Sequence, residues 1–159
     1  VIFAAGEDDE PAYSFNHALI QEAAYESLSR ARRQALHAKI AQALESACAP
    51  GNASEPSLIA HHYSRAGDPE KAVQFWFGAA DRSGVHHAFA ESVAALGFAL
   101  AEADLISDPV RRAQLRLDAQ MRLGVAVVFL KGPQSSEAEA ALAEAHRLAQ
   151  EANAGAQLF

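Results

Sequence analysis

The 159-residue sequence contains a single cysteine, Cys48, and a single methionine, Met121. One cysteine excludes an internal disulfide and a cysteine-rich zinc site. A chain that needs no disulfide fits a reducing compartment, so we expect a cytoplasmic location. Because the sequence begins at Val1 instead of a methionine, we expect it to be a piece of a longer protein.

Positive charge and long apolar runs are also scarce. Lysine and arginine number 13 against 20 aspartates and glutamates, which gives a formal net charge of -7. Nucleic-acid binding depends on a basic surface that neutralises phosphates, so we expect no nucleic-acid partner. The longest apolar run, residues 125–130, is far shorter than the roughly 20 residues of a membrane span, so we expect no membrane contact.

The motifs of the common catalytic sites are missing as well. The sequence has neither the Gly-x4-Gly-Lys-Ser/Thr loop that cradles phosphates nor a Gly-x-Ser-x-Gly nucleophile turn. Its two histidine pairs, at 61–62 and 86–87, are adjacent residues that point about 100° apart on a helix, which hinders binding of a shared metal. We therefore expect no enzyme activity, no cofactor and no metal site in this chain.

Alanine dominates what is present, with 38 of the 159 residues. Alanine is the strongest helix former and is depleted in strands, which favours an all-α fold. Apolar periodicity and stop signals predict about seven helices with short connections, over roughly 16–29, 30–48, 55–66, 69–83, 89–103, 110–130 and 136–152. Residues 1–3 and 13–15 favour strands and predict a small N-terminal β-hairpin, with a disordered start as the alternative.

Apolar residues also predict what lies in the core. Trp76, with Phe75 and Phe77, is expected to be buried rather than to line a ligand pocket. The helix over 110–130 carries apolar residues on two faces, which predicts that it packs between two neighbours. One predicted face contains Leu117, Met121, Gly124, Val125 and Val128.

A repeat signal separates a solenoid from a compact bundle. Residues 58–80 show the parts of a helical hairpin of the tetratricopeptide type, in which small residues allow close helix approach and aromatic ones fill the gaps. These parts are Ala60, Tyr63, Gly67, Ala72, Trp76 and Ala79, and a similar order recurs over 123–145. The pattern favours antiparallel helical hairpins stacked as a short tetratricopeptide-like α-solenoid, and an irregular helical bundle is the alternative.

Four short segments carry a family resemblance. They read Phe15-x-His17-Ala18-Leu19-Ile20-Gln21-Glu22-Ala23-Ala24-Tyr25 and Arg33-x2-Leu36-His37-x2-Ile40-Ala41, followed by Ala60-His61-His62-Tyr63 and Lys71-Ala72. This pattern resembles the region after the ATPase module of bacterial multidomain adenylate/guanylate cyclases with a STAND-type ATPase. The resemblance is strongest over 13–100. It implies that residues 1–29 are the remnant of a winged-helix-like element, a hairpin plus a helix, and that 30–159 form a tetratricopeptide-like helical repeat domain.

The resemblance also implies a function. It points to a non-catalytic regulatory and protein-interaction domain, in a parent chain with a nucleotide cyclase and an ATPase module. The expected partner is a protein or peptide, or the upstream ATPase module of the same chain. Two alternatives are the repeat domain of a STAND-type transcriptional regulator and a structural self-association module that forms a homodimer by solenoid stacking.

Six residues are candidates for partner binding. If Tyr63 holds the aromatic position of the repeat, then His61, Ser64 and Arg65 face the groove of the solenoid. A basic cluster of Arg30, Arg32 and Arg33 stands at the start of a helix, where positive charge opposes the helix dipole. It calls for a compensating group, such as the acidic turn at residues 7–10 or the upstream ATPase module. For both sets the alternative is ordinary solvated surface.

Overall fold

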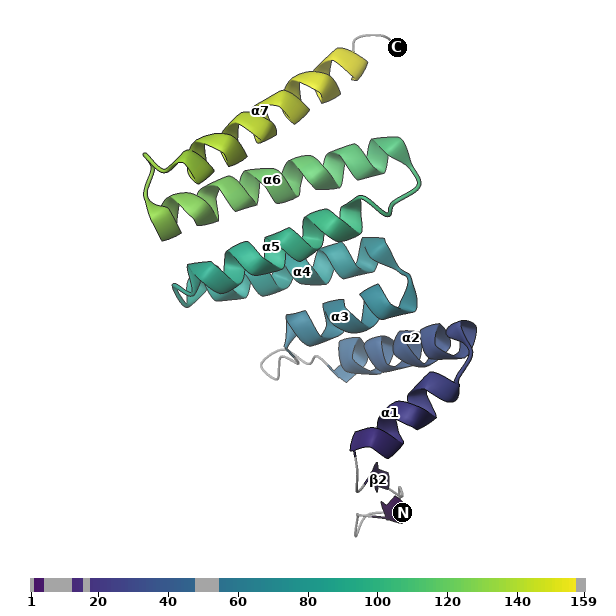
Figure 1. Cartoon of the computed structure of the whole chain (residues 1–159). Helices are drawn as coiled ribbons and strands as arrows, with labels where there is room; N and C mark the ends of the chain where they lie inside the picture. Colours follow the sequence, from purple (N-terminus) through teal and green to yellow (C-terminus); the bar gives the residue numbers. More distant parts are fainter. Residues whose placement is uncertain (1, 5–12, 16–17, 48–54, 157–159) are drawn as a thin grey trace.

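The computed structural model describes residues 2–4, 13–15, 18–47 and 55–156 (Figure 1). Helices account for nearly all of this part, which confirms the predicted all-α class. They are α1 (Ala18–Ser27), α2 (Arg30–Ala47), α3 (Pro56–Ala66), α4 (Pro69–Val85), α5 (Phe89–Ala103), α6 (Pro109–Lys131) and α7 (Ser136–Ala156). Two short strands precede them, β1 (Ile2–Ala4) and β2 (Tyr13–Phe15), and these pair antiparallel.

Local signals set the helix boundaries. The side chain of Asp68 accepts a hydrogen bond from the backbone N–H of Lys71 at 3.1 Å, and Asp108 caps α6 in the same way. Each capping aspartate is followed by a proline at the first helical position, where a missing N–H does no harm. The helix starts predicted at about residues 69 and 110 are thereby confirmed, to within one residue. Gly67 ends α3 with φ 81°, in the left-handed region that glycine enters without strain.

Consecutive helices from α2 to α7 pack against one another in chain order (Figure 1). Alternate helices α4 and α6 also touch each other, across α5. Most core positions are alanine, and the largest fully buried side chains are Tyr63, Ile59, Leu96 and Val73. Trp76 and Phe77 are buried as predicted, while Phe75 is half-buried and stacks on Tyr63 with 5.5 Å between ring centroids.

A chain of aromatic hydrogen bonds joins the first three helices. Tyr25 Oη on α1 lies 2.9 Å from His37 Nε2 on α2, and His37 Nδ1 lies 2.9 Å from His62 Nδ1 on α3. Burial lowers the pKa of both imidazoles, and nearby positive charge adds to the effect: His62, Arg65 and His61 act on His37, and His61 acts on His62. The His–His bond needs at least one neutral ring, because two imidazolium ions have only donors to offer.

A second polar cluster joins α2, α3 and α4. Tyr63 donates a hydrogen bond to the carboxylate of Glu45, and Lys71 Nζ lies 3.0 Å from both Glu45 Oε2 and Tyr63 Oη. The bonds from Tyr63 and Lys71 lower the pKa of Glu45, so the carboxylate stays ionised. The buried Tyr63 thereby has a partner for its hydroxyl group, and the cluster fixes the relative position of three helices.

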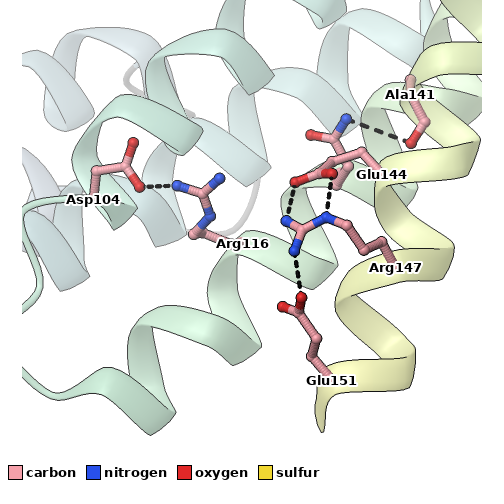
Figure 2. Close-up of polar contacts among 7 residues, drawn as sticks. Asp104, Arg116, Ala141, Glu144, Arg147 and Glu151 are labelled. Atoms are coloured by element: carbon pink, nitrogen blue, oxygen red, sulfur yellow. Dashed lines mark hydrogen bonds and ion pairs between the residues drawn. The ribbon is translucent and has the colours of Figure 1, made fainter.

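The C-terminal helices use surface ion pairs (Figure 2). Arg116 on α6 pairs with Asp104 after α5, and Arg147 on α7 pairs with Glu144 and Glu151 of its own helix. The buried amide of Gln120 donates to the backbone carbonyl of Ala141 across the α6–α7 interface. Exposed ion pairs such as those of Arg116 and Arg147 each add little to stability. The burial of apolar side chains between α6 and α7 therefore stabilises this end of the chain.

The structure corrects one predicted apolar face. Met121 and Val125 were expected to be covered by a neighbouring helix, but they are 56% and 55% exposed. The reason is that α6 contacts its neighbours through other residues, which include Leu115, Ala119 and Val127. Periodicity identified an apolar face, but it did not show that this face borders a hollow. None of the described helices combines the length and apolar composition that a membrane span requires.

Candidate functional site

A large hollow in the described part of the chain lies between α4 and α6, above α5. It has a volume of about 810 Å³, and we call it the α4–α6 groove. Val85 contributes to the wall on α4, while Met121, Val125 and Phe129 form the wall on α6. Leu96 of α5 lies at the bottom and is 1% exposed. A hollow of this size on a helical protein is typical of a binding site.

The apolar walls of the groove are open to solvent. Met121, Val125 and Phe129 are spaced four residues apart on α6, so they share one helix face over about 12 Å. Phe129 is 65% exposed and Val85, across the groove, is 76% exposed. The ring of Phe129 is held by a contact within the chain, because it stacks on the ring of Phe89 with centroids 5.0 Å apart and an interplanar angle of 10°. The wall is therefore exposed and ordered.

Apart from the exposed His87, few polar groups line the interior of the groove. The hydroxyl group of Ser92 on α5 already donates to the backbone carbonyl of Ala80 on α4, at 3.0 Å. This bond uses the donor of the side chain and closes the floor of the groove. The interior thus offers apolar contact and little hydrogen bonding.

Three charged side chains stand at the rim. The guanidinium of Arg122 on α6 lies 2.7 Å from Asp81 Oδ1 on α4 and 2.9 Å from Asp118 Oδ1 on its own helix. It also sits 4.7 Å above the ring of Phe77. Burial opposes the charged guanidinium, but the bonds to Asp118 and Asp81 outweigh it and raise the pKa of Arg122. Two carboxylates therefore face one cation, and the rim keeps an excess of negative charge.

A smaller hollow of about 380 Å³ lies on the other side of the helix stack, between α3 and α5 above α4. Trp76 and Phe98 line it and stack on each other with centroids 4.8 Å apart. The buried Nε1 of Trp76 has no hydrogen-bond partner among the described residues. The more polar residues of this hollow include Arg82 and Glu91, and it has less apolar lining surface than the α4–α6 groove.

The predicted residues of α3 lie outside both hollows. His61 and Arg65 are exposed, and Ser64 is half-buried and donates a hydrogen bond to Glu102 near the end of α5. Ser64 therefore faces α5, and its hydroxyl group has a partner within the chain. A partner-binding role for these three residues remains a prediction.

The predicted basic cluster lies in the first turn of α2. Arg30 and Arg32 are exposed, and the guanidinium of Arg33 lies 5.4 Å above the ring of Tyr25. The backbone N–H of Arg32 bonds to Ser29 Oγ at 3.4 Å, so a serine cap satisfies part of this helix end. The acidic turn at residues 7–10, a proposed compensating group, lies outside the described residues. In the part that the structure describes, no hydrogen bond or ion pair joins this cluster to the predicted residues of α3.

Sequence reasoning missed the groove and its rim. Asp81 and Arg122 are 41 positions apart, and no local motif relates them. The one available signal in the sequence was that the helix over 110–130 carries two apolar faces. Phe129 extends one of them, because it follows Met121 and Val125 at the same four-residue spacing. Among the described residues, no group of three or more histidine, cysteine, aspartate or glutamate side chains is arranged to hold a metal ion.

Comparisons with known proteins find a curated relative. No family model matches the chain, and no solved structure matches it. The chain is similar to an uncharacterized protein of Rhizobium meliloti (strain 1021), with 31% identity over 127 residues. The match covers 80% of this chain and 12% of the relative, so the chain spans about one eighth of the relative's length.

Proposed function

We propose that this chain is a non-catalytic protein-docking domain, and that the α4–α6 groove is its binding surface. The observation that supports this most directly is the exposed apolar wall of Met121, Val125 and Phe129 opposite Val85. Soluble domains seldom leave such contiguous apolar surface uncovered unless another molecule binds there. The partner is a protein or peptide, or an upstream module of the same chain.

The proposed architecture is a short tetratricopeptide-like α-solenoid over 30–159, after a winged-helix-like remnant over 1–29. The chain-order packing of α2 to α7 supports stacked helical hairpins. The buried positions of Ala60, Tyr63, Ala72 and Trp76 fit the repeat pattern, in which small residues alternate with large ones. The short antiparallel pair of β1 and β2 supports the small N-terminal element.

The proposed setting is a large cytoplasmic signalling protein of the bacterial adenylate/guanylate cyclase type with a STAND ATPase module. The resemblance of residues 13–100 supports it, and so does the length of the relative, of which the match covers only 12%. Binding in the groove would regulate the parent protein if the affinity for the partner differs between two conformational states of the upstream modules. A ligand shifts a conformational equilibrium only by the difference between its affinities for the two states.

Site-specific photo-crosslinking in the full-length parent tests the docking function. A photoreactive phenylalanine analogue at position 125 stands in the groove, and the same analogue at position 110 stands on α6 outside it. Both native valines are exposed, at 55% and 64%, so the two sites are matched. We expect an adduct from position 125 that is absent from position 110. No adduct at 125, or the same adducts from both positions, would contradict a docking groove.

A further inference from the structure

We propose that the occupant of the α4–α6 groove is an amphipathic α-helix with basic side chains beside its apolar face. This inference rests on the proposed docking function and adds the chemistry of the partner. Three features of the groove support it: the nature of its walls, the spacing of its exposed side chains and the charge at its rim.

The walls favour a helix over an extended peptide. Both walls and the floor are helices, whose backbone N–H and C=O groups are bonded within each helix. An extended peptide in this groove would bury most of its backbone N–H and C=O groups against apolar side chains, where few hydrogen-bond partners are available. Ser92, the hydroxyl-bearing residue of the floor, already donates to Ala80. A helix satisfies its backbone internally and presents only side chains.

The spacing of the wall fits a helix as well. Met121, Val125 and Phe129 extend along about 12 Å of α6, which matches roughly two turns of a partner helix. A helix that lies in a groove uses apolar anchors at positions i, i+3 or i+4, and i+7, which span a similar length. Val85 meets the partner from the opposite wall. The stack of Phe129 on Phe89 holds one end of this surface in place.

The negative charge at the rim of the groove favours a positively charged partner. Arg122 is already paired with both Asp81 and Asp118, so its positive charge is used within the chain. The side chain of Asp81 is 65% exposed and that of Asp118 is 49% exposed, which leaves carboxylate oxygens open to a lysine or arginine. The formal net charge of -7 favours approach of the same kind of partner.

The test is a selection from random peptides of about 16 residues, which would span roughly 24 Å as a helix. The folded chain is immobilised and displayed peptides are enriched on it, with Val125→Gln as the groove variant. Val110→Gln, on the same helix outside the groove, is the matched control. A third variant, Asp81→Asn with Asp118→Asn, leaves Arg122 as the charge at the rim.

We expect enriched peptides with apolar residues at helical spacing and an excess of lysine and arginine. Synthetic copies should gain helical circular dichroism on binding. Val125→Gln should weaken their binding about tenfold, and Val110→Gln should leave it within about twofold. The double asparagine variant should remove the preference for basic peptides over their glutamate-substituted versions.

Two results would overturn the inference, and they differ in what they say of the docking function. Enriched peptides that depend on Val125 but are extended, proline-rich or acidic would refute the basic helix and leave the docking function standing. Peptides that bind Val125→Gln as well as they bind the unmodified chain, or no enrichment at all, would refute both.

Discussion

Replacement of Trp76 by alanine tests the packing on which the groove depends. Trp76 is 9% exposed and lies on α4, the helix that separates the two hollows. Removal of a buried aromatic side chain typically costs 3–5 kcal/mol. The buried Nε1 without a partner is already unfavourable, and its loss offsets part of that cost. We expect Trp76→Ala to lower the free energy of unfolding by about 3 kcal/mol.

Phe98→Ala is the matched control for this variant. Phe98 stacks on Trp76 but is 55% exposed, so its truncation should cost only about 1 kcal/mol. Both variants are measured by urea unfolding followed with far-UV circular dichroism, because Trp76 is the single tryptophan and its fluorescence disappears with it. Equal losses for the two variants, or a loss below about 1 kcal/mol for Trp76→Ala, would refute the assigned packing of α4.

Two other predictions concern a turn and a titration. Gly67→Ala should destabilise the chain by about 1 kcal/mol because φ is 81° there, whereas Gly97→Ala, in open space on α5, should stabilise it by about 0.5–1 kcal/mol. Calorimetry should show that the two substitutions shift the melting temperature in opposite directions. Shifts of the same sign would contradict the assigned turn. The pKa values of His37 and His62 are lowered from 6.5 in the folded chain, so the unfolded chain binds more protons below that pH. Urea unfolding should therefore show the full free energy of unfolding above pH 6.5 and a lower one as the pH falls below it. In a His37→Gln, His62→Gln double variant, the free energy of unfolding should fall less over the same pH range. An equal fall would contradict the role of this pair.

The sequence predicted the features that local chemistry controls. The start of α4 was predictable because Asp68 and Pro69 are adjacent and act on the same helix end. The burial of Trp76 was predictable from the apolar stripe on its own helix. The exposure of Met121 and Val125 was not, because periodicity reports that a face is apolar and says nothing about which neighbour covers it. The rim was also beyond prediction, since Asp81 and Arg122 meet only after α4, α5 and α6 have packed.

We propose that the α4–α6 groove, and not the smaller hollow, receives the partner. The chain offers one natural probe for each, because its single methionine, Met121, lines the groove and its single tryptophan, Trp76, lines the hollow. In one NMR titration with a basic amphipathic helical peptide from the selection, the ¹³C-methyl signal of Met121 and the indole N–H signal of Trp76 are followed together. We expect the Met121 signal to shift to saturation while the Trp76 signal stays in place. A titration that shifts Trp76 and leaves Met121 unchanged would contradict it.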